Sequence, residues 1–91
     1  LPIYQVDLMI VIGGFNSSNT KKLIQVCEEK GVEARHIESF HQLNQKWFIR
    51  KQHIGITAGT STPEDIINQV HYEIVKIAKE VEGMEEQALH S

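Results

Sequence analysis

Two short stretches of the sequence gather side chains that donate hydrogen bonds but carry no charge. They are GGFNSSN, residues 13–19, and AGTST, residues 58–62. Hydroxyl and amide groups of this kind bind anions such as phosphates, and glycines let the backbone approach a ligand closely. Neither stretch contains Cys, His, Asp or Glu, so the chemistry they suggest is anion binding rather than catalysis. The candidate donors are Ser17, Ser18, Asn19 and Ser61, with Thr60 and Thr62 nearby.

Each stretch joins a predicted strand to a predicted helix. Val6–Ile12 and His53–Thr57 are short, mainly apolar and rich in β-branched residues, which is typical of buried parallel strands. A helical pattern follows over residues 18–30. A second one opens with Thr62 as the expected N-cap and Pro63 as the first helical residue. Helix N-termini favour anions, so both stretches lie where an anion would be bound.

The order of elements predicts a small α/β domain. Val32–Ile37 supplies another strand, while residues 38–52 show no clear pattern beyond room for a helical turn near residues 43–48. Strands alternating with helices favour a three-layer domain with a mainly parallel sheet, in the strand order 2-1-3. Both polar loops then meet at the crevice where the chain reverses direction. We expect this domain to span residues 1–82, with Gly83 ending the last helix and residues 83–91 forming a frayed tail.

A simpler interpretation of the loops stays open. Ser, Thr, Asn and Gly are also the residues that cap helices and form turns, so each loop could be a cap and nothing more. Neither loop matches a P-loop or the G-x-G-x-x-G pattern. It is the meeting of two such loops at one crevice that favours a ligand.

Composition excludes several other functions. The net charge of −3 and the absence of a basic stripe argue against nucleic acid as a partner, and no apolar run is long enough to span a membrane. Cys27 is the single cysteine, which rules out an internal disulfide and predicts a reducing intracellular setting. It falls on an apolar helix face and is expected to be a small buried hydrophobe. The histidines are scattered, so we expect no metal site and no catalytic residue in this chain.

The two loops also carry a family resemblance. VDLMIVIGGFNSSNTKKL and IGITAGTSTPEDII resemble the C-terminal third of the 4-hydroxy-3-methylbut-2-enyl diphosphate reductases. The resemblance covers residues 6–70, and its N-S-S-N and A-G-x-S-T-P motifs are specific as a pair. It implies one of three similar α/β domains around a [4Fe–4S] iron–sulfur cluster. Ser17, Ser18, Asn19 and Ser61 would then bind the substrate diphosphate; Thr60, often alanine in the family, is a mild departure.

The resemblance further implies an oxidoreductase of the non-mevalonate isoprenoid pathway. Two electrons from ferredoxin or flavodoxin would remove the hydroxyl group of the substrate, giving isopentenyl and dimethylallyl diphosphate. The expected location is the cytoplasm of a bacterium or a plastid-type organelle. The cluster cysteines and the acid–base residues of the family have no counterpart in this chain, so it should be inactive alone. The alternative is a stand-alone phosphate- or diphosphate-binding regulatory module without catalysis.

Overall fold

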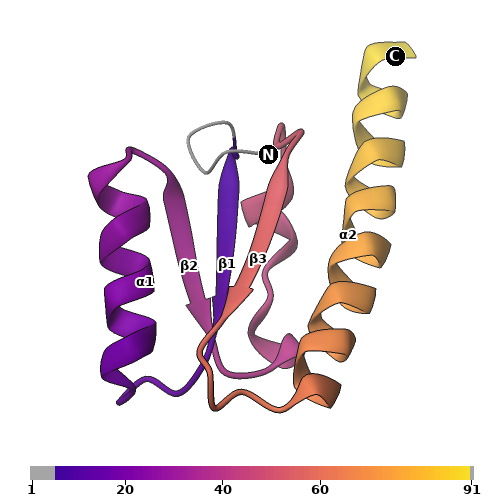
Figure 1. Ribbon diagram of the computed structural model, residues 1–91. Helices are drawn as coiled ribbons and strands as arrows, with labels where there is room; N and C mark the ends of the chain where they lie inside the picture. The colour runs from indigo at the N-terminus through magenta and orange to yellow at the C-terminus, as the bar shows by residue number, and fades with distance from the viewer. Residues whose placement is uncertain (1–5, 91) are drawn as a thin grey trace.

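The computed structural model describes residues 6–90 and has three layers around a parallel sheet (Figure 1). The central strand β1 (Leu8–Ile12) pairs in parallel with β2 (Glu33–Ile37) on one side and with β3 (Ile54–Ala58) on the other. The strand order is therefore β2-β1-β3, which confirms the order predicted from the sequence. Ile12 lies opposite both Ile37 and Ala58, so the carboxyl ends of all three strands are level.

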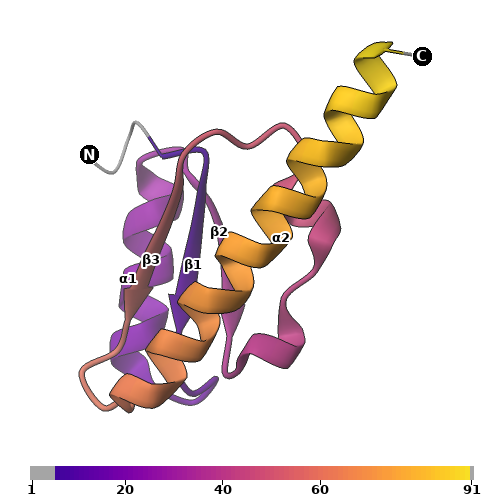
Figure 2. The ribbon, with the colours of Figure 1, turned by 90° about the vertical axis from the view of Figure 1, so that its right-hand side faces the viewer.

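The alternation of side chains along β1 divides the core into two layers. Met9 and Val11 face α1 (Ser18–Glu29) and pack with its buried Cys27. Leu8, Ile10 and Ile12 pack on the opposite face in a second cluster, to which α2 (Glu64–His90) contributes. Figure 2 shows α2 crossing that face of the sheet. Because both faces are covered, all of β1 is buried, as its apolar sequence predicts.

The helix α1 has the local signals that its sequence predicts at both ends. At its start Ser17 is the N-cap, and its hydroxyl oxygen accepts a hydrogen bond from the Thr20 amide at 3.3 Å. Just beyond its end Gly31 has φ 72°, a left-handed conformation that glycine adopts without steric cost. These two ends fix where the chain leaves β1 and where it enters β2.

The segment between β2 and β3 forms two short 3-10 helices, η2 (Phe40–Gln42) and η3 (Gln45–Phe48). This confirms that a helical turn lies near residues 43–48. Phe48 is buried against β1 and α2, and Trp47 packs on the edge of the same cluster. The segment therefore completes the core on the α2 side.

The helix α2 differs from its predicted limits at both ends. Its first α-helical bond runs from the Ile67 amide to the Pro63 carbonyl, so the helix begins at Glu64, one residue later than expected. At the other end it continues through Gly83 to His90, so the predicted stop at Gly83 is wrong. Gly83 keeps a negative φ, and the good helix formers around it offset its entropic cost. Ser91 lies outside the described residues.

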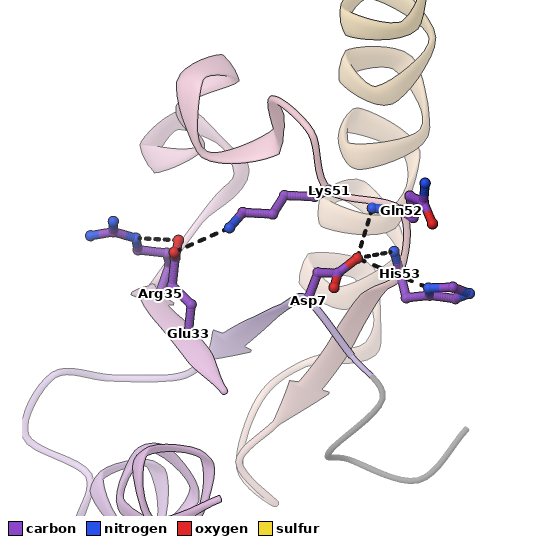
Figure 3. Close-up of polar contacts among 6 residues, drawn as sticks. All are labelled: Asp7, Glu33, Arg35, Lys51, Gln52 and His53. Carbon is purple, nitrogen blue, oxygen red and sulfur yellow. Dashed lines mark hydrogen bonds and ion pairs between the residues drawn. The ribbon is translucent and has the colours of Figure 1, made fainter. Parts of the chain in front are cut away.

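The amino ends of the strands are joined by charged side chains (Figure 3). One Asp7 carboxylate oxygen accepts hydrogen bonds from the amides of Gln52 and His53, at 2.8 and 3.0 Å. Glu33 pairs with Lys51 at 3.3 Å and with Arg35 at 3.4 Å. Both clusters tie the segment before β3 to neighbouring strands, so they help to set the position of β3 beside β1.

Candidate functional site

The two polar loops lie side by side at the carboxyl end of the sheet. The first loop follows Ile12, the last residue of β1, in the chain. The second loop is hydrogen-bonded to that residue: the Gly59 amide donates to the Ile12 carbonyl at 3.0 Å, and the Thr62 hydroxyl donates to the same oxygen at 3.2 Å. Figure 1 shows the two connections meeting below the strand arrowheads. The two loops are therefore adjacent at this end of the sheet, and Thr62 binds the second loop to the end of β1 instead of capping α2.

The second loop approaches the start of α1 closely at Gly59. A Cβ atom on Gly59 would lie 3.1 Å from the Thr20 hydroxyl oxygen and 4.0 Å from the Asn19 side-chain nitrogen. A Cβ atom on Gly13 would overlap the same Thr20 hydroxyl. Asn19 of one loop thus lies next to the backbone of the other. Space requires a glycine at position 13, whereas a Cβ atom at position 59 would make a tight contact with Thr20.

Ser17 is oriented by the helix that it caps. Its hydroxyl oxygen accepts the Thr20 amide, which leaves the hydroxyl hydrogen available to donate to a ligand. The amides of Ser18 and Asn19 are the first two of α1 and have no acceptor within the helix. Donors of the side chain and of the backbone therefore converge at one helix end.

The remaining predicted donors face solvent. The side chains of Ser18, Asn19 and Ser61 are exposed, and none has a hydrogen-bond partner within residues 6–90. Ser61 follows Gly59 by two residues, so it belongs to the loop that touches Asn19. Asn19 thus lies at the contact between the loops, with Ser17 and Ser18 beside it in one and Ser61 in the other.

The two helix N-termini differ in charge. The first turn of α1 has no acidic residue, and Lys21 and Lys22 follow it. The first turn of α2 contains Glu64 and Asp65, which already complement the positive end of that helix. An anion between the loops is therefore attracted mainly to the N-terminus of α1. The second loop contributes hydroxyl donors to its binding, and the dipole of α2 contributes little.

Sequence reasoning missed the support behind the first loop. The His36 Nε2 atom lies 2.8 Å from the Gly13 carbonyl oxygen, so this nitrogen carries the proton and donates it. The Phe15 ring packs edge-on against the same imidazole, with centroids 4.5 Å apart. In the sequence His36 was one scattered histidine among several. The register that sets it opposite Val11 of β1 would have revealed its place near the loop.

A cavity of about 350 Å³ lies elsewhere, at the amino end of β3. Phe48, Ile54 and Val81 form part of its wall, and neither polar loop contributes to it. Of its two charged lining residues, Lys51 is already paired with Glu33, and Glu82 is a carboxylate that would repel an anion. The cavity therefore lacks the set of open donors that marks the crevice.

The described residues do not fit a metal cluster. No group of three or more His, Cys, Asp or Glu side chains among them could hold a metal ion. Cys27 is 1% exposed among apolar side chains, and burial, with a smaller contribution from Glu28, raises the pKa of its thiol. A buried thiol with a raised pKa is a poor ligand and a poor nucleophile. Within residues 6–90, no helix is both long and apolar enough to cross a bilayer.

Fold and crevice together define an open parallel α/β domain whose candidate ligand site lies at the topological switch point. Residues 2–75 match the family described as LytB protein, and the chain belongs to this family. The 4-hydroxy-3-methylbut-2-enyl diphosphate reductase of Geotalea uraniireducens is 51% identical over 76 residues, which cover 84% of this chain and 27% of the relative. The reductase of Syntrophotalea carbinolica is 44% identical over 75 residues.

Comparison with solved structures points to the same family. A structure of (E)-4-hydroxy-3-methyl-but-2-enyl diphosphate reductase, the terminal enzyme of the non-mevalonate pathway, superposes with a TM-score of 0.78 at 42% identity. The superposition covers 81% of this chain and 26% of the solved enzyme. The Plasmodium falciparum E-1-hydroxy-2-methyl-but-2-enyl-4-diphosphate reductase gives a TM-score of 0.71 at 33% identity, covering 74% of this chain and 21% of the enzyme. The chain thus spans about a quarter of the length of these relatives.

Proposed function

We propose that this chain is the part of a 4-hydroxy-3-methylbut-2-enyl diphosphate reductase that holds the diphosphate group of the substrate. The observation that carries the proposal is the meeting of two loops with open, uncharged donors at one crevice, in a chain of the LytB family. A diphosphate has many acceptor oxygens and no donor when fully ionised, so a cluster of donors suits it. The names of the relatives supply the substrate.

Each donor has a distinct part in this proposal. Ser17, whose oxygen is occupied by the Thr20 amide, donates its hydroxyl hydrogen to a phosphate oxygen. The free amides at the start of α1 and the side chains of Ser18 and Asn19 bind adjacent oxygens. Ser61 binds from the second loop. Because these donors are neutral, they bind the anion without requiring charged partners to be buried.

The reaction of the whole protein is part of the same proposal. The complete reductase removes the hydroxyl group of the substrate as water, using two protons and two electrons from ferredoxin or flavodoxin, and gives isopentenyl and dimethylallyl diphosphate. A [4Fe–4S] cluster would mediate that electron transfer, but the described residues of this chain offer it no ligand set. We therefore assign to this chain binding and orientation of the substrate only. The bacterial relatives support a cytoplasmic location.

The test is a double change, Ser17→Ala with Ser61→Ala, in the full-length gene product. A hydrogen bond to a charged group contributes about 1.5–3 kcal/mol, so KM should rise by at least about a hundredfold. Gln52→Ala is the matched control. Its exposed amide lies at the amino end of the sheet, and only its backbone is used by Asp7. A double variant with the KM and kcat of the parent would sink the proposal.

A further inference from the structure

Thr20 is a buried polar residue whose hydroxyl group has no partner. Its side chain is fully buried, and among the side chains described, those of residues 6–83, it contributes the only buried oxygen or nitrogen atom without a hydrogen bond. Buried hydroxyl groups are ordinarily hydrogen-bonded, because their transfer from water is otherwise unfavourable. The hydroxyl group therefore does not explain why a threonine stands here, and the reason is to be sought in the shape of the side chain.

The contacts of Thr20 supply that reason. Its hydroxyl oxygen lies against the backbone of Gly13 in the first loop and of Gly59 in the second. Its methyl group lies 3.2 Å from where a Cβ atom of Gly13 would stand. Both branches of the side chain thus fill the space under the two loops. A smaller residue would leave a void there, and the loops could relax toward each other.

The backbone of Thr20 acts on the same loop. Its amide donates to the Ser17 hydroxyl oxygen and so orients the proposed anion donor. The side chain and the amide of Thr20 together fix the position of Ser17 relative to the loop that carries Ser61. No other described residue has a hydroxyl group so close to both glycines.

We propose that Thr20 is a positioning residue that sets the separation of the two donor loops, and hence the fit of the diphosphate between them. The proposal rests on the proposed function, because the readout is substrate binding. Thr20 is too buried to touch the substrate itself. What it supplies is shape, so a valine, which has nearly the same volume, should replace it and an alanine should not.

Four variants of the full-length gene product test this: Thr20→Val, Thr20→Ala, Gly59→Ala and the double change Thr20→Ala/Gly59→Ala. Gly59 does not have a left-handed backbone, so its added methyl group tests space alone. We expect Thr20→Ala to raise KM about tenfold, at a kcat within about twofold of the parent, because misplaced donors weaken binding in ground and transition states alike. Thr20→Val should keep the KM of the parent.

The double variant Thr20→Ala/Gly59→Ala is the most discriminating of the four. Gly59→Ala alone should raise KM about threefold, since its methyl group and the Thr20 hydroxyl push the loops apart. With Thr20→Ala that methyl group enters the vacated space, and KM should return to within about threefold of the parent, a strongly non-additive result. If the two effects multiply instead, or if Thr20→Ala leaves KM unchanged, the proposal is overturned. Should Thr20→Ala fail to fold, a raised KM in Thr20→Val or a parental KM in Gly59→Ala overturns it equally.

The Ser17→Ala/Ser61→Ala protein, assayed alongside, separates the two claims. If it binds poorly while every Thr20 and Gly59 variant behaves like the parent, diphosphate binding stands and the positioning role falls. If it binds as well as the parent, the proposed function fails first. A merely structural Thr20 would lower the unfolding temperature in Thr20→Ala without moving KM.

Discussion

The two ends of the sheet are both lined by exposed polar residues, yet they use them in opposite ways. At the amino end Asp7 and Glu33 accept hydrogen bonds and ion pairs from the segment before β3. At the carboxyl end the side chains of Ser18, Asn19 and Ser61 have no partner within residues 6–90. The polar groups of one end are thus charged and paired with each other, whereas the donors of the two loops at the other end are neutral and open.

The difference teaches where to look for function in a small α/β domain. Charged residues attract attention in a sequence, but here they bind each other and hold β3 in place (Figure 3). The open donors are the small neutral residues beside the glycines. Changes at the amino end should therefore alter stability and leave binding intact, whereas changes at the carboxyl end should alter binding.

The largest effect is expected from Gly13→Ala. The new methyl group would overlap the Thr20 hydroxyl, and overpacking of this kind costs about 1–3 kcal/mol of unfolding free energy. Gly83→Ala is the matched control. Gly83 lies within α2, and nothing lies within 4 Å of its added Cβ atom, so the change should raise the free energy of unfolding by about 0.5–1 kcal/mol. If urea denaturation gave both changes the same sign, the close packing of Gly13 against Thr20 would be contradicted.

A smaller effect of opposite sign is expected from Thr20→Val. The change removes the buried hydroxyl group without a partner and keeps the side-chain volume. Relieving that desolvation should raise the unfolding free energy by about 1 kcal/mol. Urea denaturation measures the gain. A clear loss of stability would show that the hydroxyl group has a partner after all.

Asp7→Asn probes the amino end, with a smaller expected loss because the group is exposed. Hydrogen bonds from the His53 and Gln52 amides lower the pKa of the Asp7 carboxyl in the folded chain. A carboxyl group whose pKa is lower in the folded chain than in the unfolded chain stabilises the fold at pH values above its unfolded pKa. This contribution to the free energy of unfolding is lost as the pH falls through the folded pKa. The variant should be less stable than the parent at pH 7 and approach it at about pH 3 in thermal unfolding. KM should not change; a raised KM would break the contrast between the two ends.

The smallest effect is expected from Asp65→Asn in the first turn of α2. Removing this negative charge near the crevice should lower the dissociation constant for the diphosphate about twofold, with the gain fading at high salt. Isothermal titration calorimetry at two salt concentrations measures it. Glu82→Gln, the same type of change near the far end of α2, should have no effect. Equal effects of the two changes would argue against an anion near the helix N-termini.

The sequence predicts the parts of the structure that depend on local signals. The apolar run of β1 and the helical pattern that follows it each act within a few residues, and both elements are confirmed. The strand order 2-1-3 follows from the alternation of elements and the handedness of their crossovers. The position of both loops at the crevice follows in turn.

What the sequence does not reveal depends on contacts between distant segments. Thr20 resembles any other residue of a helix first turn, and only the packing of Gly13 and Gly59 against it shows its burial. His36 gains its place through strand register. The end of α2 was misplaced because Gly83 was taken as a stop, although neighbouring helix formers outweigh a single glycine.

The most direct test of the account is a crystal structure of the full-length gene product with 4-hydroxy-3-methylbut-2-enyl diphosphate bound. The account predicts phosphate oxygens at about 2.7–3.2 Å from the hydroxyl groups of both Ser17 and Ser61, with the start of α1 facing the diphosphate. A diphosphate bound in contact with neither loop would contradict it.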